Sequence, residues 1–135
     1  MKNNLKILFM GTPDFALNSL DSICNSKHNL CCVVTSPDRK SGRGQKIKNS
    51  PVKDYCLDNN INLIQTESFE DDKFLKRIKK FNADVFVVVA FKILPKKVWT
   101  IPHLGTINIH ASLLPNLRGA APINWAIIHG LNKTG

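Results

Sequence analysis

Acidic side chains are scarce in this sequence, which has 10 aspartates and glutamates against 19 lysines and arginines and a net charge of +9. Much of the excess lies between Ser36 and Lys53, where Asp38 is the one acid. The basic residues of this segment are Arg39, Lys40, Arg43, Lys46, Lys48 and Lys53. A basic segment of this kind suits a polyanion such as a nucleic acid. On charge alone a solvated surface loop is the simpler interpretation, because lysine and asparagine are plentiful along the whole chain.

Long hydrophobic runs are also missing. The apolar run nearest the N-terminus, Ile7 to Met10, stops at Gly11 and is too short for the core of a signal peptide. No stretch of the sequence approaches the roughly 20 apolar residues that a helix needs to cross a bilayer. We therefore expect a cytoplasmic protein.

Cysteine pairs with the spacing of a metal site or a redox motif are absent. The four cysteines are Cys24, Cys31, Cys32 and Cys56, and they form no C-x-x-C pair. The adjacent Cys31 and Cys32 would point to opposite faces of a strand. The pattern predicts reduced, mostly buried thiols and no metal site.

What the sequence does contain is a repeated alternation of strand and helix patterns. Its 135 residues, 43% of them apolar, have the size and composition of one globular domain. Strands are expected at 5–10, 30–35, 61–65, 85–91 and 104–110, and helices at 15–23, from 51 onward, at 70–81 and at 121–129, with a helical turn near 95–98. Ser50 is placed to cap the helix that Pro51 opens. Segment 70–81 has acids in its first turn and bases in its last, which complements the helix dipole.

The run VFVVVAF at 85–91 has no polar alternation and needs cover on both faces. Such strands are typical of the middle of parallel sheets flanked by helices. The sequence therefore predicts an α/β fold with a Rossmann-like open, mostly parallel sheet, flanking helices and right-handed crossovers. A dinucleotide-binding domain is disfavoured, because GTPDFA after the first strand lacks the G-x-G-x-x-G spacing.

Two polar side chains, Asn108 and His110, share one face of the last predicted strand, since residues two apart in a strand point the same way. By pattern alone, this is most simply the solvated face of an edge strand. In open α/β sheets, however, ligands bind beyond the carboxyl ends of the strands, where strand order reverses. The position of Asn108 and His110 at such an end favours a functional site.

Three motifs taken together resemble the methionyl-tRNA formyltransferases. They are GTPDFA after the first strand, SPDRKSGRGQKIKNSPVK after the second and LGTINIHASLLPNLRGAAPINWAI around the fifth. The resemblance covers Leu5 to Gly135 and implies the N-terminal formyltransferase domain of that family. It implies transfer of a formyl group from 10-formyltetrahydrofolate to the α-amino group of initiator methionyl-tRNA, for translation initiation.

The resemblance also assigns roles to residues. Asn108 would donate its amide N–H to the oxyanion of a tetrahedral intermediate, and His110 would accept or relay the proton of the amine. The loop Ser112, Leu113, Leu114 and Pro115 matches the family's folate contact, with the two leucines forming an apolar wall for the pterin. SGRGQK matches the insertion that distinguishes the tRNA enzymes, which makes Arg43, Lys46 and Lys48 tRNA-contact candidates on a mobile loop.

In the family a third catalytic group, an aspartate, follows the position of Gly135, as do the rest of the sheet and a C-terminal β-barrel. We therefore expect a truncated formyltransferase domain that is inactive by itself, with a separate C-terminal polypeptide as one conceivable partner. Two alternatives stay open at this point. The chain could be another folate-dependent formyltransferase, acting on glycinamide ribonucleotide or amino sugars, or a non-catalytic remnant that binds tRNA or folate.

Overall fold

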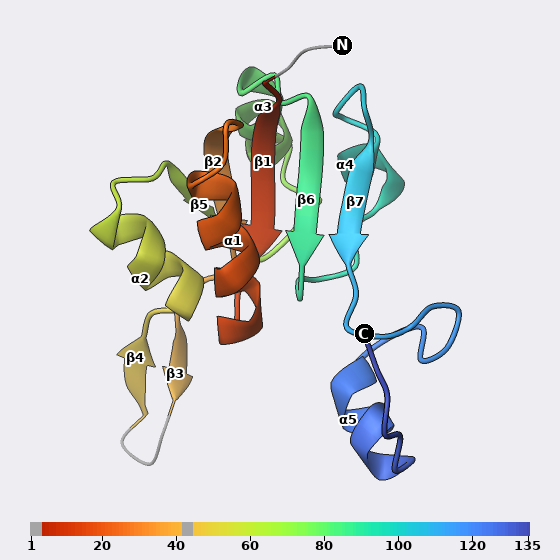
Figure 1. Ribbon diagram of the computed structural model, residues 1–135. Helices are drawn as coiled ribbons and strands as arrows, with labels where there is room; N and C mark the ends of the chain where they lie inside the picture. Colours follow the sequence, from red (N-terminus) through yellow and green to blue (C-terminus); the bar gives the residue numbers. More distant parts are fainter. Residues whose placement is uncertain (1–3, 42–44) are drawn as a thin grey trace.

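Five parallel strands form the centre of the computed structural model, which describes residues 4–41 and 45–135. Their spatial order is β5-β2-β1-β6-β7 (Figure 1). The strands are β1 (Lys6–Gly11), β2 (Asn29–Thr35), β5 (Leu63–Gln65), β6 (Val85–Val89) and β7 (Thr106–Ile109). Every residue of β6 is buried, as its uninterrupted apolar run predicts. The strand ends at Val89 rather than at Phe91, because Ala90 has a φ of 46° and an extended strand cannot contain a left-handed residue. The predicted Rossmann-like parallel sheet is confirmed.

Helices cover both faces of the sheet. They are η1 (Asp14–Ala16), α1 (Leu17–Cys24), α2 (Pro51–Asp58), α3 (Asp72–Lys80), α4 (Lys96–Trp99) and α5 (Pro122–Ile128). Figure 1 shows α1 in front of the sheet, α3 and α4 behind it, and α5 beyond the ends to which the strand arrows point. The last helix therefore lies at the carboxyl edge of the sheet, where a parallel α/β protein binds its ligands.

Alternate residues of the strands feed two apolar layers. In β1, Ile7 and Phe9 pack with Leu20 of α1 and with α2, whereas Leu8 and Met10 pack on the opposite face with α3. This division follows from the two-residue period of a strand, which sends successive side chains to opposite faces. Most of the core is fully buried, and burying each large side chain contributes about 1.5–3 kcal/mol.

The Ser50 cap predicted for the helix at Pro51 is confirmed, and the helix predicted at 70–81 forms as α3, which begins at Asp72. The Ser50 hydroxyl accepts a hydrogen bond from the Lys53 amide at 3.1 Å, with Pro51 at the first helical position of α2. The Asp71 carboxylate accepts one from the Lys73 amide at 2.9 Å and caps α3, whose last turn carries the expected bases.

The basic segment differs from its prediction. Instead of one irregular loop, its described parts form an antiparallel hairpin of β3 (Arg39–Ser41) and β4 (Lys46–Lys48). We call these two strands the basic hairpin. Its pattern is charged rather than alternating, and residues on either side of it are hydrogen-bonded to the rest of the domain. Arg43, a predicted tRNA contact, lies outside the described residues.

The thiols are buried as expected. Cys31, Cys32 and Cys56 lie in the core, and Cys24 is partly exposed. Burial raises the pKa of Cys32 and of Cys56 to about 12. Within residues 4–41 and 45–135, no cluster of three histidine, cysteine or acidic side chains could hold a metal ion. Over the same residues, no helix has both the length and the apolar character required to cross a membrane.

Candidate active site

Strand order reverses between β1 and β6. From β1 the sheet continues through β2 to β5 on one side, and from β6 it continues to β7 on the other. The chain segments that leave β1 and β6 diverge at this point, which is the usual place for a ligand in an open α/β sheet. Two cavities lie here, and residues 90–92, directly after β6, line both of them.

The larger cavity, which we call the cleft, has a volume of about 750 Å³. Large apolar side chains dominate its lining, and they come from several separate elements. They include Phe15, Phe91, Ile93, Leu94, Trp99 and Ile123. A concave, mostly apolar site with a few polar groups is the usual form of a small-molecule site. Its volume and aromatic walls suit a flat aromatic ligand.

The polar side chains of the cleft come from β7, from the residue directly after it, and from Lys92 and Asn124. Thr106, Asn108 and His110 all line it, and Ile109 does so at the end of the strand. The structure thus brings Asn108 and His110 together in one cavity. Asn108 lies opposite the buried Val88 in the register of β7 against β6, and this register fixes the position of Asn108 along the strand. Because the strand has period two, the Asn108 amide and the His110 imidazole reach the same space.

The His110 ring is held by the loop that follows it. Its Nε2 lies 2.9 Å from the carbonyl oxygen of Leu117. A carbonyl oxygen can only accept, so Nε2 must carry the proton in this contact. In the neutral ring Nδ1 is then the atom with a free lone pair. The loop therefore selects a tautomer in which Nδ1 can accept a proton.

The predicted folate loop lies beside the cleft rather than in its lining. The lining includes Ala111 and resumes at Gly119, so the side chains of residues 112–115 are not part of it. The loop folds back on itself, with the Ser112 hydroxyl donating to the carbonyl oxygen of Asn116 at 2.8 Å. Leu113 and Leu114 are exposed. Their contact with folate stays a prediction.

The smaller cavity, which we call the basic pocket, has a volume of about 490 Å³ and lies beyond the ends of β1 and β2. Hydroxyl groups of Thr12, Ser36 and Ser50 line it. Its cationic side chains are Arg39, Lys48 and Lys92. Lys48 was a predicted tRNA contact. Lys46 is exposed on the same hairpin but does not line this pocket.

The sequence reasoning missed several lining residues. Trp99 and Ile123 enter the cleft from α4 and α5, and Lys92 contributes to both cavities. The available signal for Trp99 was a large aromatic side chain on a short helical turn, and for Lys92 a cation placed just after a fully buried strand. Neither signal is specific without the fold.

The fold agrees with what comparison with known proteins finds. The family model described as formyl transferase matches residues 4–135. The chain belongs to the formyl transferase family. This confirms the family that the three motifs indicate.

Individual relatives of this family narrow the resemblance. The chain is 56% identical over 131 residues to a methionyl-tRNA formyltransferase of Flavobacterium johnsoniae, and the match covers 97% of this chain and 42% of that protein. It is 50% identical over 134 residues to a methionyl-tRNA formyltransferase of Bacteroides fragilis, covering 99% of this chain and 41% of the relative. The chain thus spans about two fifths of the length of these curated relatives.

A solved structure supports the fold independently. The crystal structure of glycinamide ribonucleotide transformylase 1 from Symbiobacterium toebii superposes with a TM-score of 0.75. The superposition covers 100% of this chain and 65% of that one, at 14% sequence identity. At this identity the likeness establishes the formyltransferase fold, not a shared substrate.

Proposed function

We propose that this domain transfers a formyl group from 10-formyltetrahydrofolate to the α-amino group of initiator methionyl-tRNA. One observation carries the proposal. The cleft that holds Asn108 and His110 lies directly beside a basic pocket and hairpin, so a small-molecule site and a polyanion surface share one wall. The 56% identical relative of Flavobacterium johnsoniae, named methionyl-tRNA formyltransferase, supports it.

The chemistry follows from the two polar side chains. The α-amino nitrogen of methionine attacks the formyl carbon, a C–N bond forms and the carbonyl oxygen becomes anionic. The Asn108 amide N–H donates a hydrogen bond to that oxygen, which stabilises the charge as it develops. The nitrogen loses its proton to Nδ1 of His110, whose Nε2 is occupied by the Leu117 carbonyl.

Collapse of the intermediate completes the transfer. The bond from the formyl carbon to N10 of the folate breaks, its electron pair goes to N10, and N10 takes up a proton that His110 can return. The products are formylmethionyl-tRNA and tetrahydrofolate. Neither Asn108 nor His110 becomes acylated. The apolar walls at Phe91 and Trp99 hold the pterin. Residues 112–115, which lie outside the lining of the cleft, would contact its edge.

The positive charge of the basic hairpin supports the proposed binding of tRNA. Lys46 and Lys48 are exposed on the basic hairpin, and with Arg43 they are the proposed phosphate contacts. Hydroxyls of the basic pocket add neutral donors that suit a sugar-phosphate backbone. We further propose that the part of the relatives beyond the matched region supplies the third catalytic carboxylate and the β-barrel that the family resemblance implies.

A chimaera provides the test. Residues 1–135 replace the matching part of the Flavobacterium johnsoniae relative, and the purified protein is given 10-formyltetrahydrofolate with initiator methionyl-tRNA or with glycinamide ribonucleotide. Formylation of the tRNA alone is the expected result. Formylation of glycinamide ribonucleotide in its place would contradict the proposal and favour a small-amine formyltransferase. The intact relative, assayed in parallel, shows the rate that a compatible domain should reach.

A further inference from the structure

The basic hairpin has few internal means of holding its position. Its strands have three residues each, and all of Lys46–Lys48 is exposed. Arg39 lies opposite Lys48, and like charges facing each other across a strand pair are destabilising. A two-stranded hairpin is at best marginally stable without further packing. The direction of this hairpin must therefore be set where it joins the domain.

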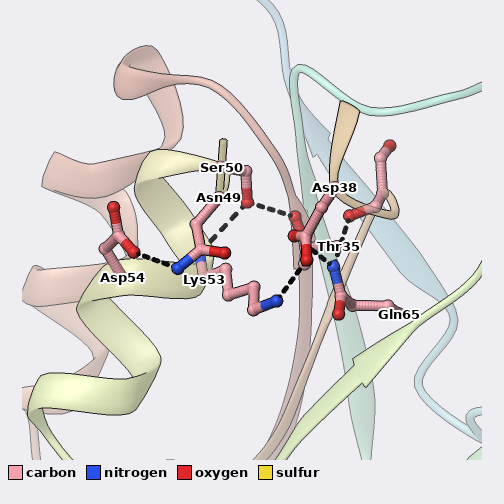
Figure 2. Close-up of polar contacts among 8 residues, drawn as sticks. Thr35, Asp38, Asn49, Ser50, Lys53, Asp54 and Gln65 are labelled. Carbon is pink, nitrogen blue, oxygen red and sulfur yellow. Dashed lines mark hydrogen bonds and ion pairs between the residues drawn. The ribbon is translucent and has the colours of Figure 1, made fainter. Parts of the chain in front are cut away.

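On the incoming side, Asp38 makes that connection. Its Oδ2 accepts a charge-assisted hydrogen bond from Nζ of Lys53 on α2, and its Oδ1 accepts one from Nε2 of Gln65 on β5 at 2.9 Å. The same Gln65 amide donates to the carbonyl oxygen of Ser36 at 3.2 Å. Figure 2 shows Asp38 between Lys53 and Gln65. One carboxylate thus ties the residue before β3 to a helix and to an edge strand.

On the outgoing side, the attachment is made by neutral donors. Nδ2 of Asn49 donates to Oδ1 of Asp54 at 2.8 Å, and the Ser50 hydroxyl, which caps α2, lies 3.1 Å from the Thr35 hydroxyl (Figure 2). Both sides of the hairpin are therefore fastened around the first turn of α2. Among the residues that the structure describes here, only the incoming side depends on an ion pair.

We propose that Asp38 is a positioning residue for RNA binding, which holds the basic hairpin so that Arg39 and Lys48 face the basic pocket beside the cleft. This inference rests on the proposed function, since it concerns how that function's RNA surface is oriented. Lys53 then serves the attachment rather than the phosphates, because its charge is already paired and its side chain is only 17% exposed.

Charge and position predict opposite effects at Asp38. It is the one acid among the basic residues of 36–53. Removing its charge makes the segment more positive and, on charge alone, a better binding surface for a polyanion. If charge alone matters, Asp38→Asn binds tRNA more tightly. If Asp38 positions the hairpin, the same change binds initiator tRNA more weakly although the protein has become more basic.

The experiment compares Asp38→Asn with Asp58→Asn in the 135-residue chain. Asp58 is exposed at the end of α2, so its substitution makes the same change in net charge away from the hairpin. Binding of initiator methionyl-tRNA is measured for wild type and both variants at one salt concentration. We expect Asp38→Asn alone to raise the Kd, by about fivefold. Equal or tighter binding by both variants would overturn the inference.

A second measurement does not require RNA. Amide hydrogen exchange in β3 and β4, followed by NMR, should become faster in Asp38→Asn and stay unchanged in Asp58→Asn, while β6 amides stay protected in both and show that the domain is folded. Unchanged exchange in the hairpin would overturn the inference whatever the RNA result. If the chimaera does not formylate methionyl-tRNA, the proposed function fails, and the exchange data still decide whether Asp38 positions the hairpin.

Discussion

The cleft and the basic pocket share residues 90–92 as a wall, yet side chains of different chemical character line them. Aromatic and aliphatic side chains such as Phe91 and Trp99 form most of the cleft, with Asn108 of β7 and His110 directly after it among its polar groups. Hydroxyls and cations form the basic pocket, beside a hairpin held by hydrogen bonds and an ion pair. The difference fits the proposed function, in which one side of the wall would carry out the chemistry and the other would bind a large anionic substrate.

The largest expected effect tests the chemical side. In the chimaera, His110→Ala should lower kcat by ~10²–10⁴ through loss of a general base, and Asn108→Ala by ~10²–10³ through loss of an oxyanion donor. The Kd for tRNA should stay within about twofold of wild type, since phosphate contacts dominate RNA affinity. Steady-state kinetics and filter binding measure the two effects, with Asn18→Ala on the exposed face of α1 as control. Parallel losses in tRNA affinity would mean that the cleft does not act separately from the hairpin.

A smaller effect, on stability, tests the role of Ser50, whose side chain lines the basic pocket. Ser50→Ala removes both the cap of α2 and a contact with Thr35, and should lower the free energy of unfolding by about 1 kcal/mol. Ser22→Ala, at an exposed position within α1, is the matched control and should be near neutral. Urea unfolding of the three proteins measures the difference. Equal stabilities would show that the pocket does not depend on this hydroxyl.

The salt dependence of tRNA affinity tests whether the basic hairpin contacts phosphates. If Lys46 contacts a phosphate, Lys46→Ala should reduce the slope of log affinity for tRNA against log salt by about one unit. Lys27→Ala, an exposed charge in the turn before β2, should leave the slope unchanged. Titrations at four salt concentrations distinguish the two variants. Identical slopes would return the hairpin lysine to the role of a solvated surface charge.

The smallest expected effect concerns the Asp38 ion pair. Hydrogen bonds from Lys53 and Gln65 lower the pKa of the Asp38 carboxyl below its ordinary value of 3.8. A lowered pKa in the folded state means that the pair contributes stability above the ordinary pKa and loses it as pH falls through the lowered one. Wild type should therefore exceed Asp38→Asn in stability at pH 7 and approach it in strong acid. Urea unfolding across that range measures the convergence, and a gap that persists at the lowest pH would exclude the carboxylate charge as its cause.

Much of the fold was predictable because local rules and burial agree. Residues 85–89 are apolar without interruption and form the fully buried β6, and Ser50 with Pro51 gives a helix start that needs no long-range contact. The shared face of Asn108 and His110 follows from strand periodicity alone. In each case the pattern of residues nearby in the sequence was enough to predict the strand, the helix start or the shared face.

The unpredicted parts depend on distant partners. The hairpin strands have no alternation of apolar and polar side chains, and their placement depends on Asp38 reaching Gln65, 27 residues away. Trp99 and Ile123 line the same cleft only because the fold brings the end of α4 and the start of α5 to it. The position of Leu113 and Leu114 outside the cleft lining depends on how residues 112–116 turn back, which apolar character does not encode.

The buried cysteines make it possible to measure local unfolding of the two apolar layers by the reactivity of their thiols. Cys32 belongs to the apolar layer under α3, and Cys56 to the layer under α1 and α2. Only the thiolate reacts with alkylating reagents, so burial and a pKa of about 12 make both thiols inert in the closed protein at neutral pH. Alkylation of each cysteine would then track how often its own layer opens to solvent, with fragmentation of the labelled peptide distinguishing Cys32 from the adjacent Cys31. The partly exposed Cys24 supplies a reference rate in the same sample, and the two sides of the sheet can be compared without introducing a probe.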